Sequence, residues 1–262
     1  MELKENHVVI GLGGTGGTIL RSFRKRIFQD FSDEEIRKMP IGYVYVDSSM
    51  EMMDPNDPTW KVLGKNAQLG KDSQLFIRGA SLKDQLDNVD NYPGIKNWIG
   101  DRRIWDNIVG SIADDGAAAQ RRRLGRFLFS CKTSDFLTTF HVFAGLAGGT
   151  GSGSIIDVVA QIRKKYRPNI GSGLKFKIFV YCLVPEQTPK PGWDKGFYHA
   201  NGYAALQELN ALSIENFKPH DVSGEFDRID LEGGGDFFNG CYLYTNSNEN
   251  NVIVDTKTDL PN

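Results

Sequence analysis

Five glycines fall within nine residues near the centre of the chain, and they follow an apolar run directly. The apolar run covers residues 140–144, the glycines lie in residues 145–153, and apolar residues recur at helical spacing over 155–162. This pattern predicts a strand, a glycine loop and a helix in succession. Glycine lets backbone N–H groups approach a ligand, and a helix N-terminus adds unpaired donors and partial positive charge. The segment therefore predicts an anion site, most naturally for phosphate, with short hydroxyls from Thr150 and Ser152.

A second glycine run lies near the start of the chain. Gly11, Gly13 and Gly16 match the G-x-G-x-x-G pattern, between an apolar run at 7–10 and a helical pattern at 19–28. A second strand is expected at residues 41–46, and the intervening helix makes the pair a right-handed, parallel βαβ unit. Asp47 ends this strand, where it is placed to meet a ribose or a metal-bound water near the first glycines. An Asp here also suits a cap of the next turn.

The rest of the chain continues the alternation of strands and helices. Strands are expected at 175–184 and 241–244, and a helix at 197–212. At least five parallel strands alternating with helices predict an α/β fold, a doubly wound, mostly parallel sheet in three layers. In such folds the ligand lies at the carboxyl ends of the strands. Residues 50–113 are less regular and rich in turn signals, and we interpret them as an insertion.

Two further segments have the composition of ligand contacts. Small residues at 114–120 run into the arginines of 121–126, which favours backbone approach to a charged group with a guanidinium on phosphate. A solvated helix start is the alternative. Asn246 follows the last strand, where its amide suits a base or a ribose, although an Asn also makes turns.

Composition excludes several classes of protein. The formal net charge of the 262 residues is −2, so no overall field recruits nucleic acid or anionic membrane. No apolar window approaches the 18 residues of a membrane span. The first residues also lack the basic start and long apolar core of a signal peptide. The three cysteines lack metal-ligand spacing and each lies in an apolar run, which favours buried thiols in a reducing cytoplasm. The four histidines show no ligand spacing, and no nucleophilic catalytic constellation is present.

Taken together, these motifs resemble those of tubulin and its bacterial relative FtsZ. Residues 147–153 resemble the GGGTGSG signature, with Ala147 in place of the first glycine. Residues 11–17 resemble the first nucleotide loop, 116–120 the loop that touches the γ-phosphate, and Asn246 the residue that binds the guanine base. The order of the motifs agrees from residue 7 to 250. The pattern is most similar to bacterial tubulin-like proteins outside the FtsZ and true tubulin branches.

The resemblance implies a GTP-binding domain of a filament-forming cytoskeletal GTPase, with GTP or GDP and Mg²⁺ as ligands. The residues it assigns to nucleotide binding are Gly11, Gly13, Gly14, Thr15, Gly16, Asp47, Ala117, Ala118, Ala119, Gln120, Ala147, Gly148, Gly149, Thr150, Gly151, Ser152, Gly153 and Asn246. No catalytic residue is assigned, because in this family an acidic loop of the next subunit completes hydrolysis. We expect one nucleotide-binding domain over residues 1–262, without the family's long central helix and C-terminal domain. Little activity is expected from this chain alone.

Two other functions remain open at this stage. The first glycine run is also compatible with an NAD(P)-dependent oxidoreductase, although Asp47 lies farther from it than the usual roughly 20 residues. A non-catalytic module that binds nucleotide only to control assembly is the other alternative. The motifs do not distinguish GTP from ATP.

Overall fold

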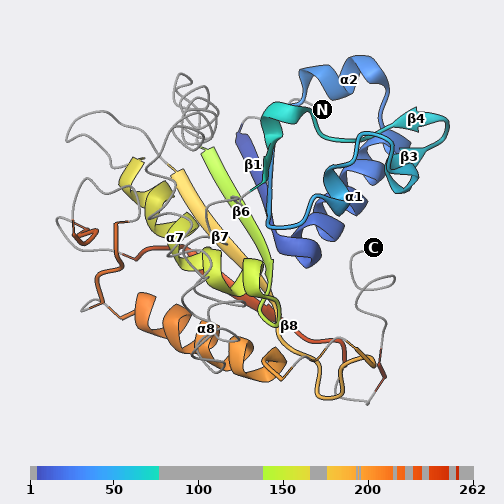
Figure 1. The fold of residues 1–262 in the computed structure, drawn as a ribbon. Coiled ribbons are helices and arrows are strands. Elements are labelled where there is room, and N and C mark those ends of the chain that lie inside the picture. The colour runs from blue at the N-terminus through green and yellow to red at the C-terminus, as the bar shows by residue number, and fades with distance from the viewer. Residues whose placement is uncertain are drawn as a thin grey trace, which may run out of the picture.

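The computed structural model describes residues 5–76, 138–165, 176–192, 194, 196–214, 217–221, 227–231, 236–247 and 252–253. A six-stranded sheet forms the centre of the molecule (Figure 1). Its strands are β1 (Asn6–Leu12), β2 (Ile41–Asp47), β5 (Gln74–Phe76), β6 (Thr138–Gly145), β7 (Phe176–Leu183) and β8 (Gly240–Tyr244). Five of the six were expected from the sequence. The sixth, β5, has only three residues and lies in the segment interpreted as an insertion, which therefore contributes a strand to the main sheet.

All neighbouring strands of this sheet run parallel, in the order β5-β2-β1-β6-β7-β8. From β1 the chain moves outward in one direction to β2 and β5, and from β6 it moves outward in the other to β7 and β8. The order therefore reverses between β1 and β6, which is where doubly wound sheets bind their ligands. The predicted doubly wound α/β fold is confirmed.

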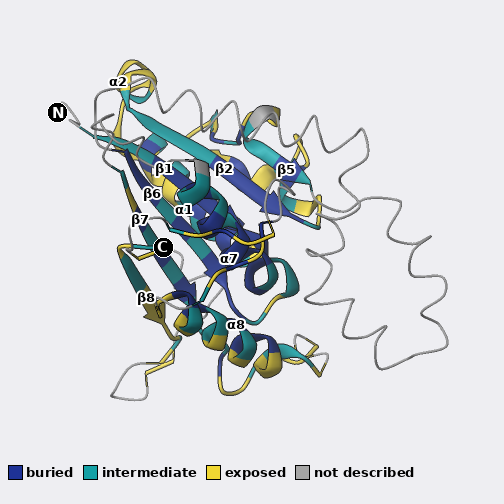
Figure 2. Cartoon of the chain, turned by 90° about the vertical axis from the view of Figure 1, so that its left-hand side faces the viewer, coloured by how far each residue is buried: buried dark blue, intermediate teal, exposed yellow. Residues whose placement is uncertain are grey.

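Helices cover both faces of the sheet. Helix α1 (Gly13–Asp30) lies on one face, and α7 (Gly149–Lys165) and α8 (Tyr198–Leu212) lie on the other (Figure 1). A short helix, α2 (Asp33–Lys38), follows α1 and starts with a capping box between Ser32 and Glu35. Strands β1 and β6 are mostly buried between these layers, whereas the edge strand β8 is mostly exposed (Figure 2).

Side chains of β1 show how the two layers divide the core. Val8, Ile10 and Leu12 pack with the apolar residues of α7 and α8, whereas Val9 packs with Leu20 of α1. Because successive side chains of a strand point to opposite faces, a strand buried on both sides needs an unbroken apolar run. The run at 7–12 satisfies this requirement, and the layer arrangement follows from it.

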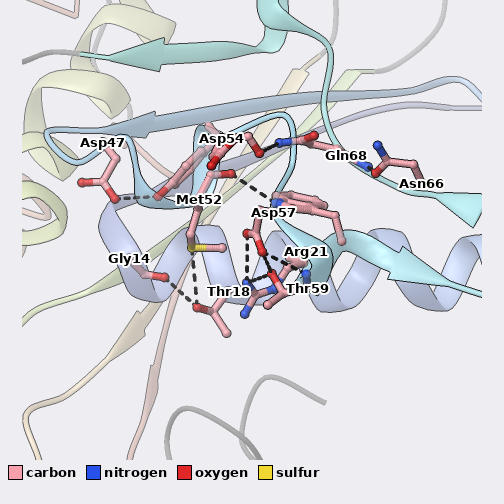
Figure 3. A network of polar contacts seen from close by, with 12 residues as sticks. Gly14, Thr18, Arg21, Asp47, Met52, Asp54, Asp57, Thr59, Asn66 and Gln68 are labelled. Atoms are coloured by element: carbon pink, nitrogen blue, oxygen red, sulfur yellow. Dashed lines mark hydrogen bonds and ion pairs between the residues drawn. The ribbon is translucent and has the colours of Figure 1, made fainter.

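The chain between β2 and β5 packs against α1. It contains three short 3₁₀ turns (Glu51–Met53, Pro58–Trp60 and Lys71–Ser73) and the two-residue strands β3 (Lys61–Val62) and β4 (Lys65–Asn66). Trp60 is fully buried and donates its indole N–H to the Met52 carbonyl oxygen. From α1, Arg21 bonds to Thr59 and Arg24 bonds to the Ala67 carbonyl oxygen (Figure 3 shows the Arg21 contact). The excursion is thus fixed to the helix at several points.

The cysteines that the sequence predicts to be buried are only partly so. Cys182 is buried and Cys241 is half-buried, both as free thiols, whereas Cys131 lies outside the described residues. The hydrogen bond to Cys241, and secondly burial, raise the pKa of the Cys182 thiol. Among the described helices, none is long and apolar enough to cross a membrane.

Two histidines pair on the face of the sheet that α1 occupies. His7 Nδ1 lies 3.2 Å from His141 Nε2, and His141 Nδ1 lies 3.2 Å from the Tyr181 hydroxyl. Burial, and secondly the charge of His7, lower the pKa of His141 from its ordinary 6.5 to about 4. The folded chain therefore binds fewer protons than the unfolded chain between these two values.

We expect the free energy of unfolding to fall as the pH drops from about 6.5 toward 4, because the unfolded state takes up the proton that folded His141 refuses. Since the imidazole is only partly buried, the expected loss is of the order of 1–2 kcal/mol. Urea denaturation at several pH values measures it. The difference between the wild type and His141→Phe isolates this residue from other titrating groups. An identical pH dependence in both proteins contradicts the prediction.

Candidate functional site

The two glycine segments lie side by side at the carboxyl ends of β1 and β6. Strand β1 ends at Leu12 and α1 begins at Gly13, while β6 ends at Gly145 and α7 begins at Gly149. The glycine loops expected from the sequence are therefore mostly the first turns of helices. Gly13 has a φ of +68°, and a Cβ on it would lie 3.1 Å from the Gly151 backbone nitrogen. The segments thus approach closely at the point where the strand order reverses.

One group of glycines is required by packing. A Cβ on Gly11 would lie 2.6 Å from the Gly16 carbonyl oxygen, and one on Gly16 would lie 2.5 Å from that of Phe143. A Cβ on Gly151 would lie 2.5 Å from the Gly145 carbonyl oxygen. Backbone atoms cannot move aside as a flexible side chain can, so a side chain at any of these positions would force the backbone to shift.

Gly14 and Gly148 belong to a second group, since a Cβ on either would have nothing within 4 Å. Both are exposed, and they stand in the first turn of α1 and directly before α7. Packing therefore does not explain these glycines. Space beside an exposed backbone at two adjacent helix starts is what a ligand that binds main-chain N–H groups needs.

The electrostatics of this edge favour an anion. The N-cap position of α1 is Leu12, whose side chain makes no capping hydrogen bond, and neither α1 nor α7 has an acidic residue in its first turn. Each helix start carries about half a positive charge. Two such ends converge here without an internal counter-charge in either first turn.

Asp47 joins this edge from the end of β2. The residue is only 6% exposed. Oδ2 accepts from the Tyr45 hydroxyl at 2.5 Å, and Oδ1 accepts from the Ser49 backbone N–H at 3.2 Å and from the Thr150 hydroxyl at 3.3 Å. Ser48 and Thr150 hydroxyl oxygens lie 2.8 Å apart. A carboxylate and two hydroxyls thus gather beside the first turn of α7.

Contacts from α8 and β7 support the start of the second glycine segment. Asn201 is buried and donates its side-chain N–H to the Ala147 carbonyl oxygen at 3.0 Å. The Leu146 backbone N–H bonds to the Leu183 carbonyl oxygen at 2.9 Å. These contacts fix residues 146–147 against β7 and α8, so the exposed Gly148 follows a rigid support.

A separate polar cluster of Glu186, Tyr198 and His199 lies after β7. Glu186 is buried, accepts a hydrogen bond from the Tyr198 hydroxyl, and its carbonyl oxygen lies 2.9 Å from His199 Nε2. Burial and the adjacent carboxylate raise the pKa of Tyr198. The group ties the loop after β7 to the start of α8.

The family model described as "Tubulin like" matches residues 8–141 and 132–262, nearly the whole chain. The chain belongs to the tubulin-like family. Its resemblance to tubulin and FtsZ, expected from the sequence motifs, is confirmed at this level.

Solved structures of tubulin-like proteins resemble this chain at low sequence identity. CetZ from Methanosaeta thermophila is 13% identical with a TM-score of 0.48, over 92% of this chain and 46% of that one. TubZ from Bacillus thuringiensis serovar israelensis, in a protofilament of the GTPγS form, is 15% identical with a TM-score of 0.45, over 94% and 48%. The present chain thus spans about half the length of these proteins. No curated protein sequence matches it.

The tubulin-like chain brings most of the predicted site residues together. Gly13, Gly14, Asp47, Gly148 and Thr150 lie around one edge of the sheet, with the remaining glycines beneath or beside them. Among the less direct members, Thr15 packs against Gly145, the carbonyl oxygen of Ala147 accepts from Asn201, and Gly149 and Gly153 lie in the first turns of α7. Residues 117–120 lie outside the described residues.

Ser152 differs from its expected role. Its side chain is fully buried, and its hydroxyl donates to the Gly148 carbonyl oxygen at 2.6 Å within the start of α7. Thr150 is the hydroxyl that reaches the polar edge, because it stands two residues earlier and so on a different side of the helix. Ser152 therefore supports the shape of the turn.

Three site residues were missed by sequence reasoning: Tyr45, Ser48 and the amide of Asn201 as a support of the glycines. Tyr45 had a usable signal, since it stands two residues before Asp47 and so on the same face of β2. Asn201 falls within the helix expected at 197–212, but that helical pattern assigns no role to its amide. Ser48 carried no signal, because a Ser after a strand is an ordinary turn residue.

Proposed function

We propose that this chain is the guanine-nucleotide-binding domain of a tubulin-like, filament-forming GTPase. The observation that carries the proposal is the convergence of two helix starts, each with an exposed glycine that packing does not require, at the switch point of a parallel sheet. Such an edge favours phosphate. We propose a guanine nucleotide because the tubulin-like protein TubZ of B. thuringiensis has been described in GTPγS and GDP forms.

In this proposal the phosphates lie over the first turns of α1 and α7. The backbone N–H groups near Gly14 and Gly148 bind phosphate oxygens, and the helix starts neutralise part of the charge. The Thr150 hydroxyl is within reach of the same oxygens. Gly11, Gly16 and Gly151 serve by letting the two segments approach each other.

Asn246 is proposed to bind the base. It is half-buried and follows β8, which lies two strands from β6 in the sheet. Two interstrand spacings amount to about 10 Å. A nucleotide whose phosphates lie beside β6 would thus run along the carboxyl edge of the sheet, past β7, toward Asn246.

The residues present fit a Mg²⁺ ion. Mg²⁺ prefers oxygen ligands and is typically bound by one or two carboxylates together with phosphates. Asp47 is buried, and none of the ion pairs among the described residues involves it, so its carboxylate lacks a cationic partner there. Asp47, with the hydroxyls of Ser48 and Thr150, would hold the ion or its water. When bound, the ion neutralises charge on the phosphates.

Hydrolysis is proposed to depend on a second subunit. We assign no catalytic residue to this chain, and we propose that a loop of a neighbouring subunit in a filament of the longer protein completes the site. Self-association and nucleotide hydrolysis would then be coupled. We propose a cytoplasmic location, with no nucleic acid or membrane as partner.

Isothermal titration of the purified chain with GTP, GDP, ATP and NAD, each with Mg²⁺, tests the ligand. Micromolar binding of GTP or GDP, with weaker binding of ATP, is the expected result. Preference for ATP would retain the site and change the base. Binding of NAD alone would contradict the proposal in favour of an oxidoreductase, and a chain that binds none of the four would contradict it as well.

A further inference from the structure

Tyr45 is almost completely buried, and its hydroxyl donates a hydrogen bond to the carboxylate of Asp47. The residue is 1% exposed, and its hydroxyl donates to Oδ2 of Asp47 at 2.5 Å. A hydrogen bond to an ionised carboxylate is stronger than one between neutral groups. This contact belongs to none of the roles assigned above, because Tyr45 lies beneath the edge where the nucleotide is proposed to bind.

The bond determines which oxygen of Asp47 faces the glycine segments. With Oδ2 held by Tyr45, Oδ1 is directed to the Ser49 backbone N–H and to the Thr150 hydroxyl. Thr150 belongs to the first turn of α7, which follows β6, and Asp47 ends β2. In the sheet β2 and β6 are separated by β1. The orientation of one carboxylate therefore links β2 to the start of α7.

The sequence of α1 makes room for the tyrosine. A Cβ on Gly17 would lie 2.5 and 2.7 Å from Cε2 and Cζ of the Tyr45 ring. Glycine inside a helix is unfavourable by about 1 kcal/mol relative to alanine. Gly17 thus departs from helix preference at a position where a side chain would clash with the ring that bonds Asp47.

We propose that Tyr45 is a positioning residue of the nucleotide site, acting through Asp47 on Thr150 and the first turn of α7. The inference rests on the proposed function and adds a residue that contacts neither the phosphates nor the base. Its ring fills the space beside Gly17, and its hydroxyl orients the carboxylate. Only the second role affects ligand affinity independently of folding.

Tyr45→Phe separates the two roles, because it keeps the ring and removes the hydroxyl. Titration with GTP and Mg²⁺ is expected to show about tenfold weaker binding, while the variant stays folded at the titration temperature. Tyr43→Phe is the matched control, since Tyr43 lies on the same face of β2 and packs on Arg24, away from Asp47. Its affinity is expected to equal that of the wild type.

A double-mutant cycle with Asp47→Asn tests the path of the effect. In the Asp47→Asn background, Tyr45→Phe is expected to change GTP affinity less than about twofold, because the carboxylate it orients is gone. Full additivity overturns the proposal, as does an unchanged affinity of Tyr45→Phe alone. If Tyr45→Phe fails to fold, the double variant must fold again, since it buries no charge; an unfolded double variant also overturns it. A wild-type chain that binds no guanine nucleotide instead refutes the proposed function itself.

Discussion

Replacing Gly148 by valine is expected to weaken guanine-nucleotide binding by at least about 100-fold and to leave the folded chain intact. Gly148 is exposed, and a Cβ on it would meet nothing within 4 Å, so the folded protein has room for the side chain. The same space is where phosphate oxygens would approach the backbone of the second segment. Isothermal titration measures the affinity, and thermal unfolding verifies the fold.

Gly70 provides the matched control for this experiment. It is exposed, its φ of −64° suits any residue, and a Cβ on it would also meet nothing within 4 Å. It stands in the excursion between β2 and β5, away from the glycine segments. Gly70→Val is expected to bind nucleotide as the wild type does. If Gly148→Val binds equally well, the ligand does not approach this glycine and the proposed phosphate position is wrong.

Replacing Gly16 by alanine is expected to lower the free energy of unfolding by at least about 3 kcal/mol, a large fraction of the stability of a typical domain. The added Cβ would lie 2.5 Å from the Phe143 carbonyl oxygen and 2.8 Å from the Gly11 carbonyl carbon. Both are backbone atoms of central strands. Relief of the contact therefore requires α1 to move away from the sheet. Urea denaturation measures the loss.

Gly14→Ala is the comparison within the same helix. Its Cβ would meet nothing within 4 Å, and alanine is favoured over glycine in a helix by up to about 1 kcal/mol. We expect unchanged or slightly higher stability. Each variant adds one methyl group to α1, and the two sites lie only two residues apart. Equal stabilities would show that the strand-to-helix contact at Gly16 is looser than described.

The sequence contained enough information for the sheet but not for the division of labour among the glycines. Buried parallel strands such as β1 need continuous apolar runs, so 7–10 and 140–144 were recognisable. Strand β5 was missed because three residues carry no period. Gly14 and Gly16 lie in the same glycine run, and only the position of Phe143, distant in sequence, shows that Gly16 is required by packing and Gly14 is not.

The polar group around Asp47 was also only partly predictable from the sequence. Asp47 was found from its place at the end of a strand, because the position follows from local pattern alone. Its contacts to Tyr45 and Thr150 depend on how β2 and α7 meet in three dimensions. Ser152 was assigned to the ligand because a sequence pattern does not show on which side of the first helical turn a hydroxyl lies.

The contact between Gly13 and Gly151 also determines where the domain can change shape. The main chains of α1 and α7 approach closely here, with the Thr150 side chain beside them, so the junction has few rotamers to exchange. Discrete rearrangements in proteins need elements with two alternative packings. If the chain binds nucleotide as proposed, we expect a response to the ligand to arise in segments such as the one after Asp47 rather than at this junction.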